Sequence, residues 1–180
     1  ENKSKTAIFA VNFKLEYTAI YSHSLQRKLE IFSCTWKTPS NIALVKYWGK
    51  TAPQIPKNAS ISFTLSKSHT ITTINFTPKD TSATEEIYFE LFFEGKKKED
   101  FKPKISKFFD RIQEYCPYLF SYNMMISSEN SFPHSSGIAS SASGMSAIAM
   151  CLMSLERSLS KIEISDEFVN KKASFLKSIP

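Results

Sequence analysis

The chain has 180 residues, of which 42% are hydrophobic and 22% charged, with a formal net charge of +6. These values suit one globular domain or slightly more, long enough to bury a core without disulfides. Lysines are spread along the chain rather than gathered in a basic stripe with interleaved aromatics, so the composition argues against a nucleic-acid module and leaves an anionic small molecule open.

The three cysteines, Cys34, Cys116 and Cys151, show no C-x-x-C spacing and no His/Cys cluster. This pattern argues against a structural zinc site and indicates a reducing compartment, so we expect a cytoplasmic protein. The apolar stretch "TAIFAVNF" (6–13) is too short to span a bilayer and lacks a cleavage site, and we predict neither a signal peptide nor a membrane partner. The initial glutamate suggests a fragment, and residues 1–35 read as an atypical N-terminal extension before a domain at 36–180.

The first clear element is "NIALVKYWGK" (41–50), where an apolar run predicts a well-buried strand over 41–45. Strand alternation places Lys46 on the same face as Ile42 and Leu44. Lys46 is then either a strand end whose side chain reaches into water or an ammonium directed at an anion. The stretch alone leaves both interpretations open.

Further strands are predicted at 59–66, 69–78 and 86–99, the last turning at Gly95. The first of them alternates strictly, with apolar residues on one face and Ser60, Ser62 and other hydroxyls on the opposite face. The lysines of "GKKKED" (95–100) indicate a solvated hairpin turn.

Helical spacing of apolar residues predicts a helix over 103–115, and a strand running into a loop follows at 121–132. Two more helices are expected, from about 140 to 155 and from 165 onward, the latter with acidic residues in its first turn. Strands joined by short hairpins and mixed with helices predict an α+β domain with an antiparallel or mixed sheet and helices on one face.

The stretch "NSFPHSSGIASSASGMSAIAMCLM" (130–153) leads from a strand into a helix that starts with small residues. Such a start allows a phosphate to approach the free N–H groups of the first turn, although small residues also serve close packing against a neighbour. It is not a Walker A loop, because no Gly-Lys-Ser/Thr follows. His134 is expected to be a surface or hydrogen-bonding residue rather than a catalyst.

Three motifs together, "PSNIALVKYWGK" (39–50), "IPKNASISFTLS" (55–66) and "ENSFPHSSGIASSASG" (129–144), resemble the diphosphomevalonate decarboxylases of the GHMP kinase superfamily in order and spacing. The resemblance covers roughly residues 36 to 176 and implies a GHMP-kinase N-terminal domain of the ribosomal protein S5 domain 2-like fold. It also implies ATP-dependent decarboxylation of mevalonate 5-diphosphate to isopentenyl diphosphate, with ATP and Mg²⁺ as cofactors, and it allows a homodimer of the full-length enzyme. In the family's mechanism ATP phosphorylates the tertiary 3-hydroxyl, and loss of that phosphate drives decarboxylation.

The resemblance assigns roles to individual residues. Lys46 matches the catalytic lysine at the reacting end of the substrate, and Ser141 matches a hydroxyl near magnesium. The residues matching the substrate-binding positions are Tyr47, Trp48, Gly49, Lys50, Ser60 and Ser62, and those matching the ATP-phosphate loop are Pro133, Gly137, Ala139, Ser140 and Ser141.

The departures from the family pattern qualify this assignment. The chain ends before the family's Gly-Ser-Gly-Ser-Ala-Cys-Arg segment, its aspartate near the 3-hydroxyl and its C-terminal domain, and "HSS" (134–136) replaces Thr-Ala-Ala. We therefore expect an N-terminal half that is inactive by itself. Two alternatives stay open: a sister enzyme, either a phosphomevalonate decarboxylase or a mevalonate 3-kinase, and a non-catalytic fragment.

Overall fold

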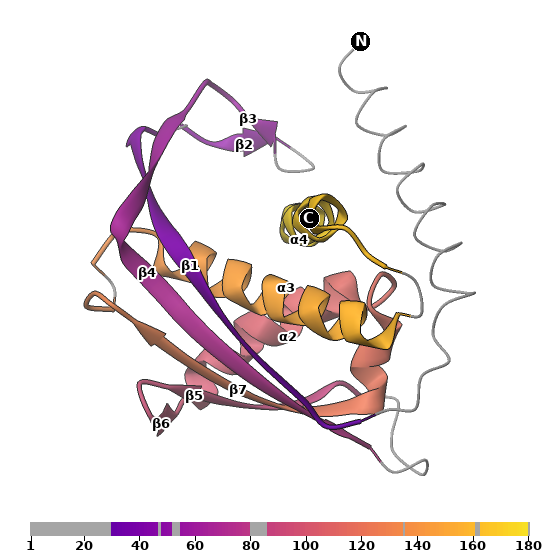
Figure 1. Cartoon of the computed structure of the whole chain (residues 1–180). Helices are drawn as coiled ribbons and strands as arrows, with labels where there is room; N and C mark the ends of the chain where they lie inside the picture. Colours follow the sequence, from indigo (N-terminus) through magenta and orange to yellow (C-terminus); the bar gives the residue numbers. More distant parts are fainter. Residues whose placement is uncertain are drawn as a thin grey trace.

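The computed structural model describes residues 30–46, 48–51, 55–79, 86–134, 136–160 and 163–179. These residues form a mixed sheet with helices on one of its faces (Figure 1). The predicted α+β architecture is therefore confirmed. No helix among the described residues is long and apolar enough to cross a membrane.

The sheet has five strands in the order β1-β4-β7-β5-β6. Strands β5 and β7 run parallel, whereas every other neighbouring pair in this sheet is antiparallel. A separate two-stranded ribbon pairs β2 (Lys50–Thr51) with β3 (Ile55–Pro56). The strands of the main sheet are β1 (Phe32–Val45), β4 (Ile61–Pro78), β5 (Tyr88–Phe93), β6 (Lys96–Lys97) and β7 (Tyr122–Asn130).

The helical layer consists of α2 (Lys102–Ile112), α3 (Ser140–Leu159) and α4 (Asp166–Ser178), with short 3₁₀ turns η1 (Glu99–Phe101) and η2 (Pro117–Ser121). Helix α3 lies along β1 and β4, and α4 packs on α3 (Figure 1). Helix α2 covers β5, where the rings of Phe109 and Phe89 meet edge to face with centroids 5.2 Å apart. All three predicted helices are confirmed; α2 ends three residues before its predicted end at 115, and α3 continues four residues beyond its predicted end at 155.

The core lies between the helices and the central strands. It contains alternate residues of β4 and β7, such as Ile74, Phe76, Met124 and Ile126, as the period of two in a half-buried strand requires. The predicted turn at Gly95 is confirmed: β5 and β6 form a hairpin, and Gly95 has a φ of +74°, which glycine adopts without strain.

Helix α4 is attached to the core by a buried ion pair. The Lys172 Nζ atom lies 2.5 Å from Glu156 Oε2 on α3 and donates a second hydrogen bond to the main-chain oxygen of Tyr115 (3.0 Å). The Lys172 side chain is fully buried, and this burial lowers its pKa. The charge is held in place by oxygen atoms from two other elements, which fixes α4 against α3.

Two details of the strand predictions are wrong. The predicted strands 59–66 and 69–78 form one strand, β4, although the pairing of β1 with β4 shifts register between Pro39 and Asn41, next to the predicted break. A strand can bend through such an irregularity without ending. The alternation pattern is interrupted at this position, but the strand continues through it.

The second error concerns burial at this end of the sheet. The stretch 41–45 is partly exposed rather than well buried, and on β4 both Ile61 and Phe63 are more than half exposed. A second register shift between Ala43 and Val45 also breaks the alternation that would place Lys46 on the face of Ile42. The apolar side chains here lie beyond the helices that cover the rest of the sheet.

Candidate functional site

The sequence-predicted site residues fall into two regions. One is the start of helix α3, with the loop before it, and the other is the segment that follows β1. Ser40 on β1 connects them, because its Oγ donates a hydrogen bond to the main-chain oxygen of Ile138, just before α3. Lys46 lies six residues farther along the chain, at most roughly 20 Å away for extended backbone.

The first turn of α3 has no side-chain cap among the described residues. Its N-cap is Ala139, which adopts the left-handed conformation with a φ of 58°, an unusual conformation for a residue other than glycine. Gly137, two residues earlier, has a φ of +80°. The loop therefore turns sharply into the helix, and the N–H groups of the first turn face no capping side chain.

A network of buried hydroxyl groups holds this helix start on the sheet. Ser143 lies at its centre: its Oγ is 2.6 Å from Thr70 Oγ1, and its main-chain oxygen accepts a hydrogen bond from Thr38 Oγ1 (2.7 Å). Thr70 also donates to Asn130 Oδ1 at 2.8 Å. Because these groups are buried and satisfied by one another, they fix the position of the first two turns of α3.

A cavity of about 250 Å³ opens beside the helix start. Its wall is formed by β4, β5, β7, η1, α2 and α3, so residues far apart in the sequence meet there. Gly144 faces this space, and a Cβ atom at that position would meet no heavy atom within 4 Å. The lining includes the predicted Ser140 and Ser141, together with Thr70, Leu91, Phe93, Asp100, Phe101, Lys104, Ile105, Ser128, Asn130, His134 and Met145.

Three rings form the aromatic part of this wall. His134 lies 5.3 Å from Phe93 and 5.1 Å from Phe101, measured between ring centroids, and the two phenylalanines are 5.6 Å apart. His134 is exposed, as predicted, and it makes ring contacts. The cavity lining thus combines an aromatic cluster with the hydroxyl groups at the start of α3.

The polar part of the cavity lining includes a buried amide group without a hydrogen-bond acceptor among the described residues. Asn130 Nδ2 is buried and has no hydrogen-bond partner within the described residues. Buried amide donors are rarely left unpaired, so this atom suits an acceptor group supplied by a ligand. The described residues contain no cluster of histidine, cysteine and acidic side chains able to hold a metal ion. A cation here would rely on a ligand's oxygens and on hydroxyls such as that of Ser141.

The lysine segment, residues 46–50, follows β1; its Lys46 and Trp48 side chains are exposed, and one asparagine contacts its main chain. Asn58 accepts a hydrogen bond from the main-chain N–H of Trp48 at its Oδ1 (2.6 Å) and donates from its Nδ2 to the main-chain oxygen of Lys46 (3.3 Å). Trp48 itself is 91% exposed. Gly49 has a φ of +148° and accepts a hydrogen bond from the N–H of Lys57 (2.9 Å).

The remaining predicted residues differ in their surroundings. Ser60 donates a hydrogen bond to the main-chain oxygen of Val45 (2.7 Å) and so ties the start of β4 to the end of β1. Ser62 is exposed and pairs with Ala43 in the sheet, and Pro133 is exposed in the loop before α3. Tyr47 and the side chain of Lys50 lie outside the described residues.

The sequence analysis missed several residues that the structure brings to these regions. Asn130 and Asn58 both lie inside the quoted motifs, and an asparagine beside a loop is a signal for turn or ligand hydrogen bonding. No sequence motif marks Lys104, Asp100 or Phe101 as site residues. They line the cavity because of how η1 and α2 pack in the fold.

Comparison with known proteins identifies a family and a shared fold. The family model of the diphosphomevalonate decarboxylase-like N-terminal domain matches residues 38–174. Among curated relatives, the diphosphomevalonate decarboxylase of Ganoderma lucidum is 31% identical over 136 residues, which make up 71% of this chain and 34% of that protein. The phosphomevalonate decarboxylase of Haloferax volcanii is 39% identical over 115 residues, 61% of this chain and 32% of that protein.

Solved structures show the same fold. The mevalonate diphosphate decarboxylase of Staphylococcus aureus superposes with a TM-score of 0.60 at 31% identity, covering 83% of this chain and 43% of that one. A structure described as MDDEF in complex with MVAPP, AMPPCP and magnesium superposes with a TM-score of 0.58 at 26% identity, covering 83% and 42%. The chain spans about a third of the length of the curated relatives that it matches.

Proposed function

The chain belongs to the diphosphomevalonate decarboxylase-like N-terminal domain family, and we propose that it forms this domain in an enzyme that converts mevalonate 5-diphosphate to isopentenyl diphosphate with ATP. The observation that carries the proposal is the uncapped start of α3, which opens onto a cavity within the matched region. A helix start of this kind binds phosphate groups, because its free N–H groups and its dipole both favour negative charge.

Within this proposal the cavity takes Mg²⁺-ATP, which supplies the phosphoryl group. Ser140 and Ser141 contribute hydroxyls at the helix start, and the hydroxyl of Ser141 would contact the magnesium ion. Asn130 Nδ2 gains the acceptor that it lacks within the described residues. The loop residues Pro133, Gly137 and Ala139 shape the approach to the phosphates by turning the chain into the helix.

The aromatic side of the cavity suits the nucleotide base. The rings of Phe93, Phe101 and His134 offer π faces and edges to a flat heterocycle, and stacking of a base on aromatic side chains is worth about 1–3 kcal/mol. Lys104 and Asp100 on the same wall offer a cation and a hydrogen-bond acceptor. The cavity thus combines a phosphate end and a base end.

The lysine segment takes the second substrate. Lys46 orients the carboxylate at the reacting end and stabilises the charge that develops during phosphoryl transfer. Lys50, with Tyr47, Trp48 and Gly49, holds the remote diphosphate, where a lysine acts as a point charge. Ser62 lies on β4 and Ser60 just before it, and the Ser60 hydroxyl bonds the main-chain oxygen of Val45, next to Lys46.

A second candidate function is phosphomevalonate decarboxylation. It is favoured by the 39% identity to the Haloferax volcanii phosphomevalonate decarboxylase, which exceeds the identity to the Ganoderma lucidum diphosphomevalonate enzyme. The two functions differ only in whether one or two phosphates occupy the remote end of the substrate. Lys50 would therefore contact a diphosphate in the first function and a single phosphate in the second.

Nucleotide binding is tested on the chain itself. Calorimetric titration with magnesium and a non-hydrolysable ATP analogue should give saturable binding, and Gly144→Leu should weaken it strongly because the new side chain fills the cavity. Gly144→Ala is the matched control, since one methyl group leaves most of the cavity open. Equal affinity of wild type and Gly144→Leu would place the nucleotide elsewhere.

The reaction is tested with an active enzyme that carries this domain. ADP release coupled to a spectroscopic assay should be fastest with mevalonate 5-diphosphate, and isopentenyl diphosphate should appear with it. Faster turnover with mevalonate 5-phosphate would favour the second candidate. ADP release from mevalonate itself, without loss of CO₂, would point to a 3-kinase and contradict both.

A further inference from the structure

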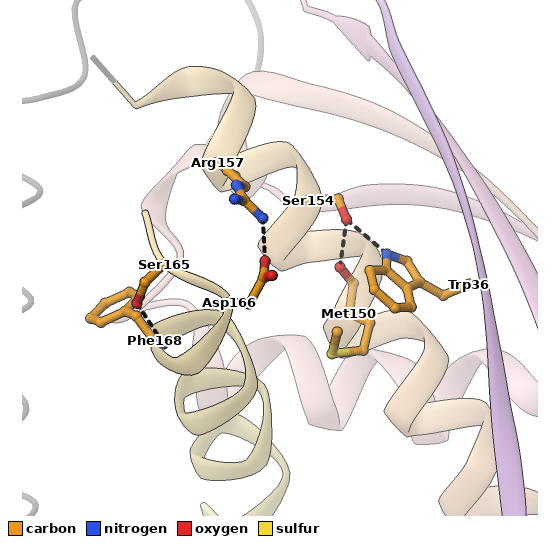
Figure 2. Close-up of polar contacts among 7 residues, drawn as sticks. All are labelled: Trp36, Met150, Ser154, Arg157, Ser165, Asp166 and Phe168. Carbon is orange, nitrogen blue, oxygen red and sulfur yellow. Dashed lines mark hydrogen bonds and ion pairs between the residues drawn. The ribbon is translucent and has the colours of Figure 1, made fainter. Parts of the chain in front are cut away.

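One row of side chains on β1 faces helix α3. Trp36 Nε1 donates a hydrogen bond to Ser154 Oγ (2.7 Å), as Figure 2 shows, and Thr38 Oγ1 donates to the main-chain oxygen of Ser143 (2.7 Å). Because alternate residues of a strand share a face, Cys34 belongs to the same row. Its partner on α3 is a second cysteine.

Cys34 and Cys151 approach each other closely. The Cys34 Sγ atom lies 3.5 Å from the main-chain oxygen of Cys151, and the Cys151 Sγ atom lies 3.8 Å from the main-chain oxygen of Cys34. The Cys151 Sγ atom also donates a hydrogen bond to the main-chain oxygen of Thr72 (3.5 Å) on the neighbouring strand β4. Each side chain therefore reaches the other residue's main chain, so the two cysteines are in direct contact across β1 and α3. Both thiols are reduced in the structure.

We propose that Cys34 and Cys151 form an oxidant-sensitive dithiol, which hydrogen peroxide converts to a disulfide that links β1 to α3. Cys34 is the point of attack, because it is partly exposed whereas Cys151 is fully buried. Cys116, the third cysteine, is also fully buried and lies after α2, apart from this pair.

The chemistry balances with one molecule of peroxide. The Cys34 thiolate attacks one peroxide oxygen, the O–O bond breaks, and Cys34 becomes a sulfenic acid while hydroxide leaves and takes up a proton as water. The Cys151 sulfur then attacks the Cys34 sulfur and the S–O bond breaks. The departing hydroxide takes the Cys151 proton and leaves as a second water. Two thiols are oxidised by two electrons, and the peroxide is reduced.

The surroundings of the two thiols support this division of roles. The neighbouring Cys151 side chain lowers the pKa of Cys34, against the opposing effect of burial. The neighbouring Cys34 side chain and then burial raise the pKa of Cys151. A lowered thiol pKa increases the thiolate fraction that reacts with peroxide.

The bridge would join the two elements that carry the candidate site. Strand β1 leads from Cys34 to Lys46, and α3 leads from Ser140 to Cys151. A disulfide between residues 117 positions apart restricts the unfolded chain over a long loop, so the oxidised protein should unfold at a higher temperature than the reduced one. The inference concerns the packing of β1 on α3 and does not depend on the proposed activity.

The test oxidises the folded 180-residue chain with hydrogen peroxide, alkylates the remaining thiols after denaturation, and maps disulfides by mass spectrometry of non-reduced peptides. We expect one linked pair of peptides that contain Cys34 and Cys151, with Cys116 alkylated. The midpoint of thermal unfolding should rise on oxidation and return after reduction.

Three variants make the result specific. Cys116→Ala should form the bridge as the wild type does, whereas Cys34→Ala and Cys151→Ala should form none and show no oxidation-dependent rise in melting temperature. Oxidation in urea should instead give a mixture of pairings, which shows that the folded state selects the pair. Alkylated Cys34 and Cys151 after oxidation, a bridge to Cys116, or disulfide-linked dimers would each overturn the proposal.

Discussion

The two halves of the candidate site are built in opposite ways. The start of α3 is fixed to the sheet by hydrogen bonds among the buried hydroxyl groups of Thr38, Thr70 and Ser143. The lysine segment follows the exposed end of β1, and its main chain is hydrogen-bonded to the side-chain amide of Asn58. One half is a fixed wall of a cavity, and the other is an exposed stretch with charged side chains.

Because of this difference, substitutions in the two regions should affect stability and function differently. Substitutions under α3 should change folding and binding together, because the same packing supports both. Substitutions in the lysine segment should change activity alone, since exposed side chains contribute little to stability. The predictions below test this separation, from the largest expected effect to the smallest.

The largest effect is expected from the buried ion pair that fastens α4 to α3. Lys172→Met removes the cation and leaves the Glu156 carboxylate buried without it, which should lower the free energy of unfolding by about 3–5 kcal/mol. Urea unfolding followed by circular dichroism measures the change. The double variant Glu156→Leu, Lys172→Met should recover most of the loss, and a loss below about 1 kcal/mol in the single variant would show that the pair is dispensable.

Lys46→Met should have the next largest effect, in the active enzyme that carries this domain. If Lys46 stabilises charge in the transition state, turnover should fall about 10²–10³-fold, as on removal of one such donor elsewhere. Thermal unfolding should be unchanged, because Lys46 is exposed. Unaltered steady-state kinetics would defeat the catalytic assignment.

Lys50→Met is the matched variant in the same segment. An interaction that is equal in the bound substrate and the transition state appears in the Michaelis constant rather than in turnover. We therefore expect Lys50→Met to raise the Michaelis constant for the phosphorylated substrate more than it lowers turnover. Identical kinetic profiles for the two lysine variants would show that they share one role.

The sequence predicts most of the fold because its signals are local. Helical spacing in 103–115, the turn at Gly95 and the acidic first turn after Ser165 each depend on nearby residues, and the structure confirms all three. The errors arise where tertiary structure decides. Alternation shows that Ile61 and Phe63 share a face, but it does not show whether a helix covers that face, and here none of the described helices does.

The candidate site shows the same limit. Ser140 and Ser141 were predicted from a motif, and the structure places both beside the cavity. Lys104 and Phe101 line the same cavity but belong to a helix and a turn whose orientation depends on packing against β5. Side chains that reach a site through tertiary packing leave no periodic signal, so they require the structure.

The uncapped start of α3 is tested by a charge that has opposite effects on folding and binding. Ser141→Asp places an anion in the first turn, where the helix dipole favours it by about 0.3–1 kcal/mol. The same anion repels a phosphate, so nucleotide affinity should fall by tenfold or more while the melting temperature holds or rises. Calorimetric titration and thermal unfolding measure the two effects, and Ser141→Asn is the uncharged control. Unchanged affinity would contradict phosphate binding at this helix start.

The smallest effect is expected at the start of α4, which is capped by its own side chain. Ser165 Oγ accepts a hydrogen bond from the Phe168 N–H (3.2 Å), and Asp166 pairs with Arg157 at 2.7 Å (Figure 2). Unlike the start of α3, this helix start has a side-chain cap, and an acidic side chain lies in its first turn, so we expect it not to bind a phosphate. Ser165→Ala should lower the free energy of unfolding by about 1 kcal/mol, the usual effect of losing an N-cap, and leave nucleotide affinity at the wild-type value. Urea unfolding and calorimetric titration measure the two effects in this variant. If Ser165→Ala lost as much nucleotide affinity as Ser141→Asp, the loss would reflect general damage to the helical layer rather than a missing contact at the start of α3.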